Sequence, residues 1–199
     1  MTQNYKPLKP QRLNRRMQYH EAVKSNDTKI TMDSPAYNVM TDLTRVEAVT
    51  IGPHESLFYA KRRMITMGVR LLLVVDNSNR VMGLLTTTDI NSEKPLNVVK
   101  EMSTSYVDLQ VDDIMTTFDK LEVLNWHDVE KARVGDIAAT LTRLGRKHAI
   151  VVDGKKNAQI IRGIFSSSQL ARATGEEIDT SAKSASFAAL EYALMQGKA

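Results

Sequence analysis

A short polar motif that follows an apolar run contains the residues best suited to bind a small molecule. The motif is Gly83-Leu84-Leu85-Thr86-Thr87-Thr88-Asp89. An aspartate just inside a helix start can accept hydrogen bonds from two vicinal ribose hydroxyls, as an acidic residue does in dinucleotide-binding folds. Thr86 and Thr88 add hydroxyl groups beside the same helix N-terminus, where backbone N–H groups favour a phosphate, and Gly83 would let the backbone approach a ligand closely. A simpler interpretation is that Asp89 only caps its helix, and the motif alone leaves both open.

A related motif about eighty residues later shows that the chain contains an internal repeat. Gly163-Ile164-Phe165-Ser166-Ser167-Ser168-Gln169 follows the same pattern, with Gln169 at the position of Asp89. Two further pairs of segments correspond, Gly68–Asp76 with Gly145–Asp153 and Val39–Thr41 with Ile114–Thr116. Each repeat is roughly sixty residues long, which buries too little surface for a secure core of its own. We therefore expect two units that share one core.

The apolar pattern of the first repeat predicts the elements that must position its motif. Alternation predicts a strand at 47–51, and Gly52-Pro53 ends it. Apolar residues at spacings of three and four predict a helix at 56–67, with Leu57, Ala60, Met64 and Met67 on one face. Strands at 71–75 and 81–86, joined by a polar turn, precede a helix that begins near 88–89. The order is strand, helix, strand, strand, helix.

The second repeat follows the same order. Its expected elements are a strand at 122–126, a helix whose apolar face runs from 134 to 144, and paired strands at 149–152 and 160–165. Between the repeats, residues 91–110 predict a helix plus linker, with Pro95 at a break or a helix start. Residues 182–196 predict a last amphipathic helix that carries Phe187, Leu190, Tyr192 and Leu194.

Composition restricts the class of protein. The chain of 199 residues is 42% hydrophobic and 25% charged, which is typical of a soluble globular protein. No apolar run approaches the length of a membrane span, and the first residues lack the apolar stretch of a secretory signal, so we expect a cytoplasmic location. The absence of cysteine excludes disulfides, thiol catalysis and thiolate metal sites.

The excess of positive charge is confined to one end. Of 27 basic and 23 acidic residues, seven and three lie in residues 1–33, so the rest of the chain carries 20 of each and the net charge of +4 belongs to this arm. The arm is polar, contains two prolines and lacks a sustained apolar period, which indicates a partly ordered segment. The arm can bind the phosphates of a nucleic acid, or it can pack against the second subunit of a dimer.

Taken together, these motifs resemble the cystathionine beta-synthase (CBS) domain, and two in tandem resemble a CBS pair, or Bateman module. The resemblance covers about residues 34–175, and it depends on the Ile-Met-Thr opening, the Gly-x-(Arg or Lys)-x5-Asp segment and the closing Gly-x-x-Thr-x-x-Asp in this order. It implies an α+β fold of two pseudo-symmetric β-α-β-β-α CBS repeats packed as one Bateman module, with an extra C-terminal helix and a basic N-terminal arm. The expected segments are an arm at 1–33, repeats at 34–91 and 111–175, a linker at 92–110 and a C-terminal helix at 176–199.

The same resemblance implies a regulatory role. CBS pairs bind adenosine-containing ligands such as AMP, ADP, ATP, S-adenosylmethionine or cyclic di-AMP in clefts between the repeats, associate into discs of two pairs and regulate a partner. By matching positions, the stronger site would consist of Thr86, Thr88 and Asp89, with Asn125 and Trp126 near the base and Arg146, Lys147 and His148 near the phosphates. The three basic or titratable residues can instead form a solvated turn, and a lone tryptophan is often a core or interface residue.

The second site implied by the resemblance departs from the family pattern. It would use Ala48, Val49, Val69, Arg70, Ser166, Ser168 and Gln169. Because Gln169 replaces the carboxylate, a ribose contact there loses the strength that charge gives to a hydrogen bond. We expect one strong site at Asp89 and one degenerate or empty site at Gln169.

We find no pattern that indicates catalysis or a catalytic cofactor. His20, His54, His127 and His148 are scattered, with no metal-binding spacing, and the sequence has neither a Gly-x-Ser-x-Gly elbow nor a P-loop. We therefore expect a non-enzymatic homodimer that responds to an adenine nucleotide and acts on an unidentified protein. The helix faces at 57–64 and 134–141 are candidates for core and interface alike. The alternative is a nucleic-acid-associated protein or scaffold in which the arm binds phosphates and the CBS pair is the dimerisation unit.

Overall fold

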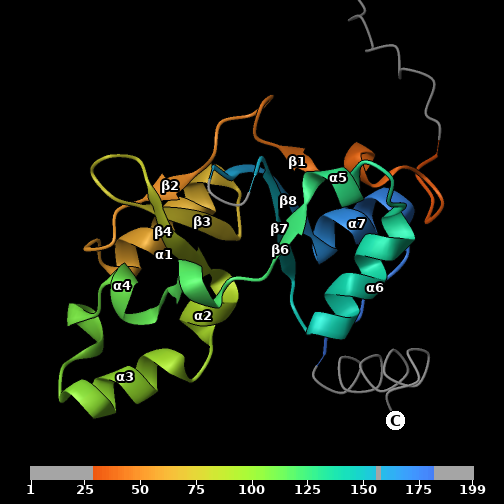
Figure 1. The fold of residues 1–199 in the computed structure, drawn as a ribbon. Coiled ribbons are helices and arrows are strands. Elements are labelled where there is room, and N and C mark those ends of the chain that lie inside the picture. The colour runs from red at the N-terminus through yellow and green to blue at the C-terminus, as the bar shows by residue number, and fades with distance from the viewer. Residues whose placement is uncertain (1–28, 156–157, 182–199) are drawn as a thin grey trace, which may run out of the picture.

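A computed structural model describes residues 29–155 and 158–181 (Figure 1). Most of the basic arm and the expected helix at 182–196 therefore lie outside the described residues. Within the described part of the chain, no helix is long and apolar enough to cross a membrane.

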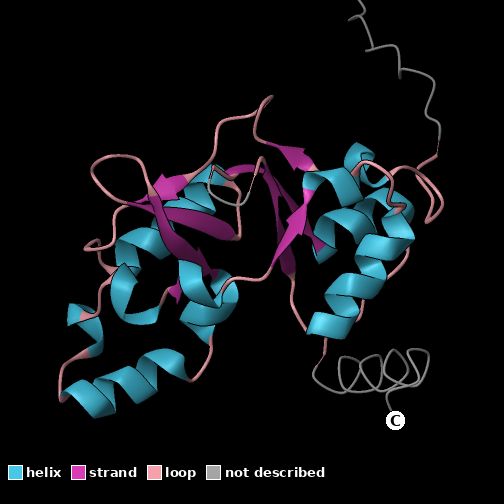
Figure 2. Cartoon of the chain, in the orientation of Figure 1, coloured by secondary structure: helices cyan, strands magenta, loops and turns pink. Residues whose placement is uncertain are grey.

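The fold consists of two four-stranded sheets with helices on their outer sides (Figure 2). The first sheet has the order β2 (Thr50–Ile51), β3 (Leu71–Val75), β4 (Val81–Thr86) and β5 (Thr116–Thr117). The second has the order β1 (Thr41–Asp42), β8 (Ile160–Ser166), β7 (His148–Asp153) and β6 (Val123–Asn125). This α+β architecture of two related units is the fold class that the repeat predicts.

The helices occur in corresponding places in the two units. The first unit has α1 (Leu57–Met67) and α2 (Thr87–Asn91), and the second has α5 (Trp126–Val129), α6 (Val134–Leu144) and α7 (Ser167–Thr174). In the sequence, α3 (Lys94–Met102) and α4 (Val111–Ile114) come between the two units, and in space they pack against the first unit (Figure 1). Short 3-10 helices lie at η1 (Ala36–Val39), η2 (Tyr106–Asp108) and η3 (Phe118–Lys120).

The two units exchange their first strands. β1 is the first strand of the first repeat, but it pairs antiparallel with β8 of the second, Thr41 opposite Ile164. In the same way β5 is the first strand of the second repeat and pairs with β4 of the first, Thr116 opposite Leu84. Each sheet is therefore completed by a strand that enters the other repeat, which ties the two units together.

A glycine allows one of these crossings. A Cβ atom added to Gly83 would lie 2.3 Å from the carbonyl oxygen of Thr116, because β5 pairs closely with β4 at this point. The sequence motif suggested that Gly83 lets the backbone approach a ligand. The structure corrects this interpretation, since the close neighbour is the crossing strand.

The helix ends follow from local sequence. Ser56 caps α1, and its hydroxyl accepts a hydrogen bond from the Tyr59 N–H at 3.2 Å. The helix ends at Gly68, whose φ of 64° is in the left-handed region, and α6 ends in the same way at Gly145 with a φ of 60°. The glycine that opens the shared segment of each repeat is thus a helix C-cap, which starts the following strand at a fixed place.

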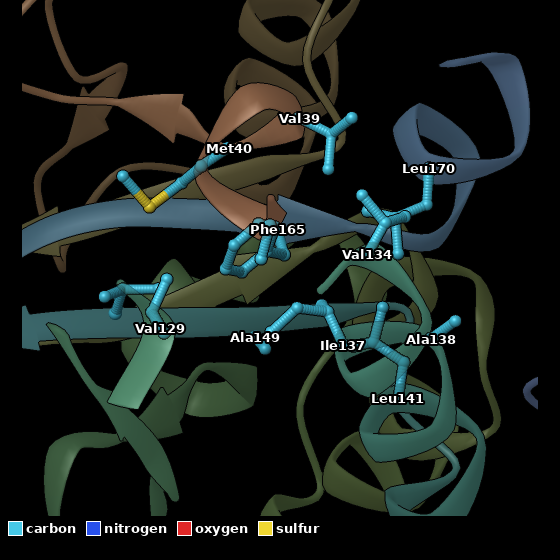
Figure 3. Packing of buried hydrophobic residues seen from close by; sticks show 12 residues of the cluster. Val39, Met40, Val129, Val134, Ile137, Ala138, Leu141, Ala149, Phe165 and Leu170 are labelled. Carbon is cyan, nitrogen blue, oxygen red and sulfur yellow. The ribbon is translucent and has the colours of Figure 1, made fainter. Parts of the chain in front are cut away.

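Three apolar clusters hold the fold together. One fills the second unit, where Phe165 of β8 lies between Val39 and Met40 on one side and Ile137 of α6 on the other (Figure 3). A second fills the first unit. A third joins the two sheets and contains Leu71, Leu73, Leu84, Ile150 and Val152. The expectation of one shared core is thus only partly correct, because the shared cluster is the smallest of the three.

Two expected strands are shorter than the sequence predicts. Only Thr50–Ile51 of the strand expected at 47–51 forms β2. The strand expected at 122–126 ends at Asn125, and Trp126 begins the short helix α5 instead. The reason is that Asn125 acts as an N-cap, its side-chain oxygen accepting a hydrogen bond from the His127 N–H at 2.9 Å.

Candidate functional site

A cleft of about 370 Å³ opens between the two units beside Asp89, and we call it the Asp89 cleft. Its first wall is the end of β4 and the start of α2, with Thr86, Thr88 and Asp89. Its second wall comes from the other repeat, where Arg146 and Lys147 occupy the turn between α6 and β7 and His148 begins β7. The structure therefore brings together six of the eight residues that the sequence assigns to this site.

Asp89 both caps its helix and lines the cleft. Its Oδ2 accepts hydrogen bonds from the Thr86 N–H at 2.9 Å and the Thr86 hydroxyl at 2.6 Å, and its own N–H donates to Thr86 Oγ1 at 3.2 Å. Its Oδ1 lies 3.9 Å from Lys94 Nζ, which is beyond hydrogen-bond range. The capping interpretation is thus correct for one carboxylate oxygen, while the second oxygen keeps its capacity to accept hydrogen bonds from a ligand.

Lys94 was not singled out in the sequence, although it holds the crossing segment in place. Its ammonium group donates hydrogen bonds to the carbonyl oxygens of Ile114 and Met115, the latter at 3.2 Å. These residues lead directly into β5, whose Thr116 lines the cleft. The long separation in sequence between Lys94 and these carbonyls explains why no local motif indicates this contact.

The basic side of the cleft is partly neutralised. Arg146 Nη2 lies 3.2 Å from Glu122 Oε2, and both side chains are substantially exposed. Solvent weakens such a pair, so Arg146 can exchange Glu122 for an anionic ligand at low cost. Lys147 is anchored through its backbone, because its carbonyl oxygen accepts a hydrogen bond from the Ser167 N–H at 2.9 Å.

His148 is the most perturbed titratable group of the site. Its pKa is lowered from 6.5 to about 4, mainly by burial and next by the positive charge of Arg70. Asp89 acts in the opposite direction, and Lys147 adds a smaller lowering effect. The imidazole is therefore neutral at neutral pH.

A second cleft of about 270 Å³ lies beside Gln169, and we call it the Gln169 cleft. The sequence-assigned residues that line it are Val69, Arg70, Ser166, Ser168 and Gln169. The Oε1 of Gln169 already accepts a hydrogen bond from the Thr41 hydroxyl at 3.1 Å. This contact occupies an oxygen at the position where Asp89 keeps one available.

Four residues that the sequence assigns to the clefts lie elsewhere. Asn125 caps α5, and the ring of Trp126 lies under the guanidinium of Arg162, with 4.9 Å from Cζ to the ring centroid. Ala48 packs against the cluster that joins the sheets, and Val49 packs against the core of the first unit.

A difference in loop length explains this misplacement. Gly68 of the first repeat corresponds to Gly145 of the second, and the same offset, extended back to the preceding strands, makes Asn125 and Trp126 the equivalents of Ala48 and Val49. In the structure Thr50 pairs with Leu73 and Val123 pairs with Ile150, so the strands correspond at an offset four residues smaller than the glycines do. In the second repeat these four additional residues form α5. Alignment of the strands would have selected Leu121 and Glu122, which do line the Asp89 cleft.

Comparison with known proteins identifies the fold. Residues 36–94 match the family profile of the CBS domain. An uncharacterized conserved protein from Pyrococcus horikoshii is similar in structure, with 24% identity and a TM-score of 0.53 over 75% of this chain and 98% of that chain. The CBS-domain-containing protein ATU1752 from Agrobacterium tumefaciens has 18% identity and a TM-score of 0.52, covering 71% and 94% of the two chains.

A third similar structure is described as CBSX2 in complex with AMP. It has 20% identity and a TM-score of 0.50, covering 70% of this chain and 95% of that chain. Comparison with curated proteins gave no match. Residues 36–94 are thus a CBS domain, and the described chain has the fold of a tandem CBS pair.

Proposed function

We propose that the protein is a sensor that binds a phosphorylated adenosine nucleotide in the Asp89 cleft and regulates a partner protein without catalysing a reaction. One observation carries this proposal: a carboxylate from one repeat and the Arg146-Lys147-His148 segment of the other line the same cleft. A carboxylate oxygen suits ribose hydroxyls, and guanidinium and ammonium groups suit phosphate. The AMP complex of the structurally similar CBSX2 is consistent with this ligand class.

The charge of the cleft favours some of the possible ligands over others. AMP, ADP, ATP and cyclic di-AMP all combine ribose with phosphate, whereas S-adenosylmethionine has a sulfonium cation in place of a phosphate. Arg146 and Lys147 would repel that cation and attract a phosphate. The proposed order of affinity therefore places nucleotides above S-adenosylmethionine.

The position of the cleft supports a mechanism of regulation. A nucleotide held by Asp89 and Arg146 at the same time contacts both repeats, so it favours the relative arrangement that allows both contacts. A ligand shifts a conformational equilibrium only by its difference in affinity for the two states. A partner that recognises the same arrangement would then bind more tightly when nucleotide is present, by linkage.

The ligand proposal is tested by calorimetric titration of AMP, ATP, GMP and S-adenosylmethionine into the wild type, Asp89→Asn and Gln169→Ala. Asparagine keeps an oxygen that can cap α2 but removes the charge, so we expect AMP binding about tenfold weaker, which corresponds to about 1.4 kcal/mol. Gln169→Ala is the matched control and should leave AMP affinity within about twofold. Equal AMP affinity in the wild type and Asp89→Asn would contradict the proposal.

We also propose that the protein forms a homodimer through the outer face of α1. Phe58 and Ile65 lie two turns apart on this helix and are 76% and 73% exposed. The helix residues that the sequence offers as candidates for core and interface alike are buried in the core of the chain, and they are Leu57, Ala60, Met64, Val134, Ala138 and Leu141. Sedimentation equilibrium of Phe58→Glu/Ile65→Glu should show a monomer. Ile160→Glu, at an equally exposed isoleucine of β8, should stay dimeric, and a dimeric double variant would refute the interface.

A further inference from the structure

His148 occupies a place shared by the two clefts. It is the first residue of β7, and it lines the Asp89 cleft, the Gln169 cleft and a small pocket of about 100 Å³ between them. Among the titratable side chains of the described residues, it alone lines all three cavities together with neighbours from both repeats.

The fold does not require a histidine at this position. His148 pairs with Ser166 in the second sheet, and Leu71 pairs with Thr86 at the same register of the first sheet. Leu71 is buried in the cluster that joins the sheets. Because a leucine satisfies the equivalent position, the imidazole of His148 is a special feature of one repeat rather than a structural necessity.

Charged groups reach the surroundings of His148 from several elements. Arg70 precedes β3, Asp89 belongs to α2, Glu122 precedes β6, Arg146 and Lys147 precede β7, and Arg172 belongs to α7. Four of these six groups are cations. The electrostatic surroundings therefore disfavour a further positive charge on the ring until an anion enters.

We propose that His148 couples the binding of a phosphate group in the Asp89 cleft to the uptake of one proton, so that the protein binds phosphorylated ligands more tightly as the pH falls. A phosphate beside the ring offsets the repulsion from Arg70 and Lys147 and accepts a charge-assisted hydrogen bond from the protonated imidazole. Binding and protonation then assist each other to the same extent, as linkage requires. The identity of the ligand rests on the proposed function, but the coupling needs only an anion.

The coupling also makes His148 a residue that selects among ligands. Adenosine has the ribose and base of AMP without the phosphate, so its binding would draw no proton to the ring. The affinity ratio of AMP to adenosine should therefore grow as the pH falls. S-adenosylmethionine, which is cationic, should bind with no proton uptake.

The coupling is tested by titrating AMP and adenosine into the wild type and into His148→Gln, at about pH 7.5 and at about pH 5. Glutamine keeps hydrogen-bonding capacity but does not titrate near these pH values. The phosphate has a pKa of its own near 6, and comparison with the variant removes its effect. Relative to the variant, wild-type affinity for AMP should increase at least about tenfold over this range. Adenosine should show no such difference between the two proteins. Parallel AMP curves for the two proteins would overturn the inference.

A second readout separates this inference from the nucleotide proposal. The imidazole resonances of the full chain are followed against pH with and without inorganic pyrophosphate, and the signal absent from His148→Gln is that of His148. Pyrophosphate should raise the pKa of this ring, and an unmoved pKa would overturn the coupling. A raised pKa in a protein that binds neither AMP nor adenosine would instead overturn the nucleotide proposal and support the coupling.

Discussion

The two clefts are built from corresponding positions of two repeats, yet they differ in chemistry. Where the Asp89 cleft has a carboxylate, the other has Gln169, whose amide oxygen is already bonded to Thr41. Where the Asp89 cleft has Arg146, the other has Val69. The two repeats therefore share the backbone that forms a cleft and differ in a few side chains, and under the proposed function these side chains determine which cleft binds a nucleotide.

The largest difference between the two repeats is expected when the glycine at each strand crossing is replaced. In Gly83→Ala the new Cβ would lie 2.3 Å from a backbone oxygen of Thr116, whereas in Gly163→Ala it would meet the flexible side chain of Met40 at 2.5 Å. We expect the first to lower the free energy of unfolding by about 3 kcal/mol or more and the second by about 1 kcal/mol. Urea denaturation measures both, and equal losses would show that the two crossings are energetically equivalent.

The pH dependence of stability should reveal the histidine that distinguishes the repeats. Because the pKa of His148 is lowered from 6.5 to about 4, the unfolded chain binds the proton first as the pH falls between these values. The wild type therefore has its full stability above about pH 6.5 and loses up to about 3 kcal/mol by pH 4 through this one group.

His148→Leu, which copies Leu71 of the other repeat, should lack this loss, and urea denaturation from pH 7 to pH 4 compares the two proteins. Carboxylates that titrate in the same range contribute equally to both, so the difference between the curves isolates the imidazole. Curves that stay parallel over the whole range would rule out a depressed pKa for His148.

The elements that contain the repeat motifs were accessible from the sequence. Strands β3 and β4 have the predicted bounds, and α1 starts and ends where Ser56 and Gly68 indicate. These elements are long enough to show a period or are bounded by residues with a fixed backbone preference. The sequence could therefore place Thr86, Thr88 and Asp89 together where β4 ends and α2 begins.

The strand exchange, and the part of the cleft formed by Leu121 and Glu122 before β6, could not be predicted in this way. β1 and β5 have two residues each, too few for any alternation, and their partners lie in the other repeat. The four extra residues that form α5 shifted the expected positions of Asn125 and Trp126. A repeat reveals which segments correspond. An insertion between two motifs changes the residue offset between the repeats, and the motif on one side of the insertion does not indicate the offset on the other side.

The smallest expected effect is that of a gain-of-function variant of the Gln169 cleft. Gln169→Asp with Val69→Arg places in the second cleft the two charges that the Asp89 cleft has and the second lacks. We expect a second equivalent of AMP to bind, weaker than the first by about 1 kcal/mol or more, because in this cleft Leu71 stands at the position that His148 has in the Asp89 cleft. Calorimetric stoichiometry measures the effect, and a value that stays at one AMP per chain would mean that these charges do not suffice to make a site.

The most direct test of the account is a crystal structure of the protein soaked with AMP. We predict electron density for one nucleotide per chain in the Asp89 cleft, with its ribose hydroxyls at the Asp89 carboxylate and its phosphate beside Arg146 and His148. Density confined to the Gln169 cleft, or an Asp89 cleft left vacant at saturating AMP, would contradict it.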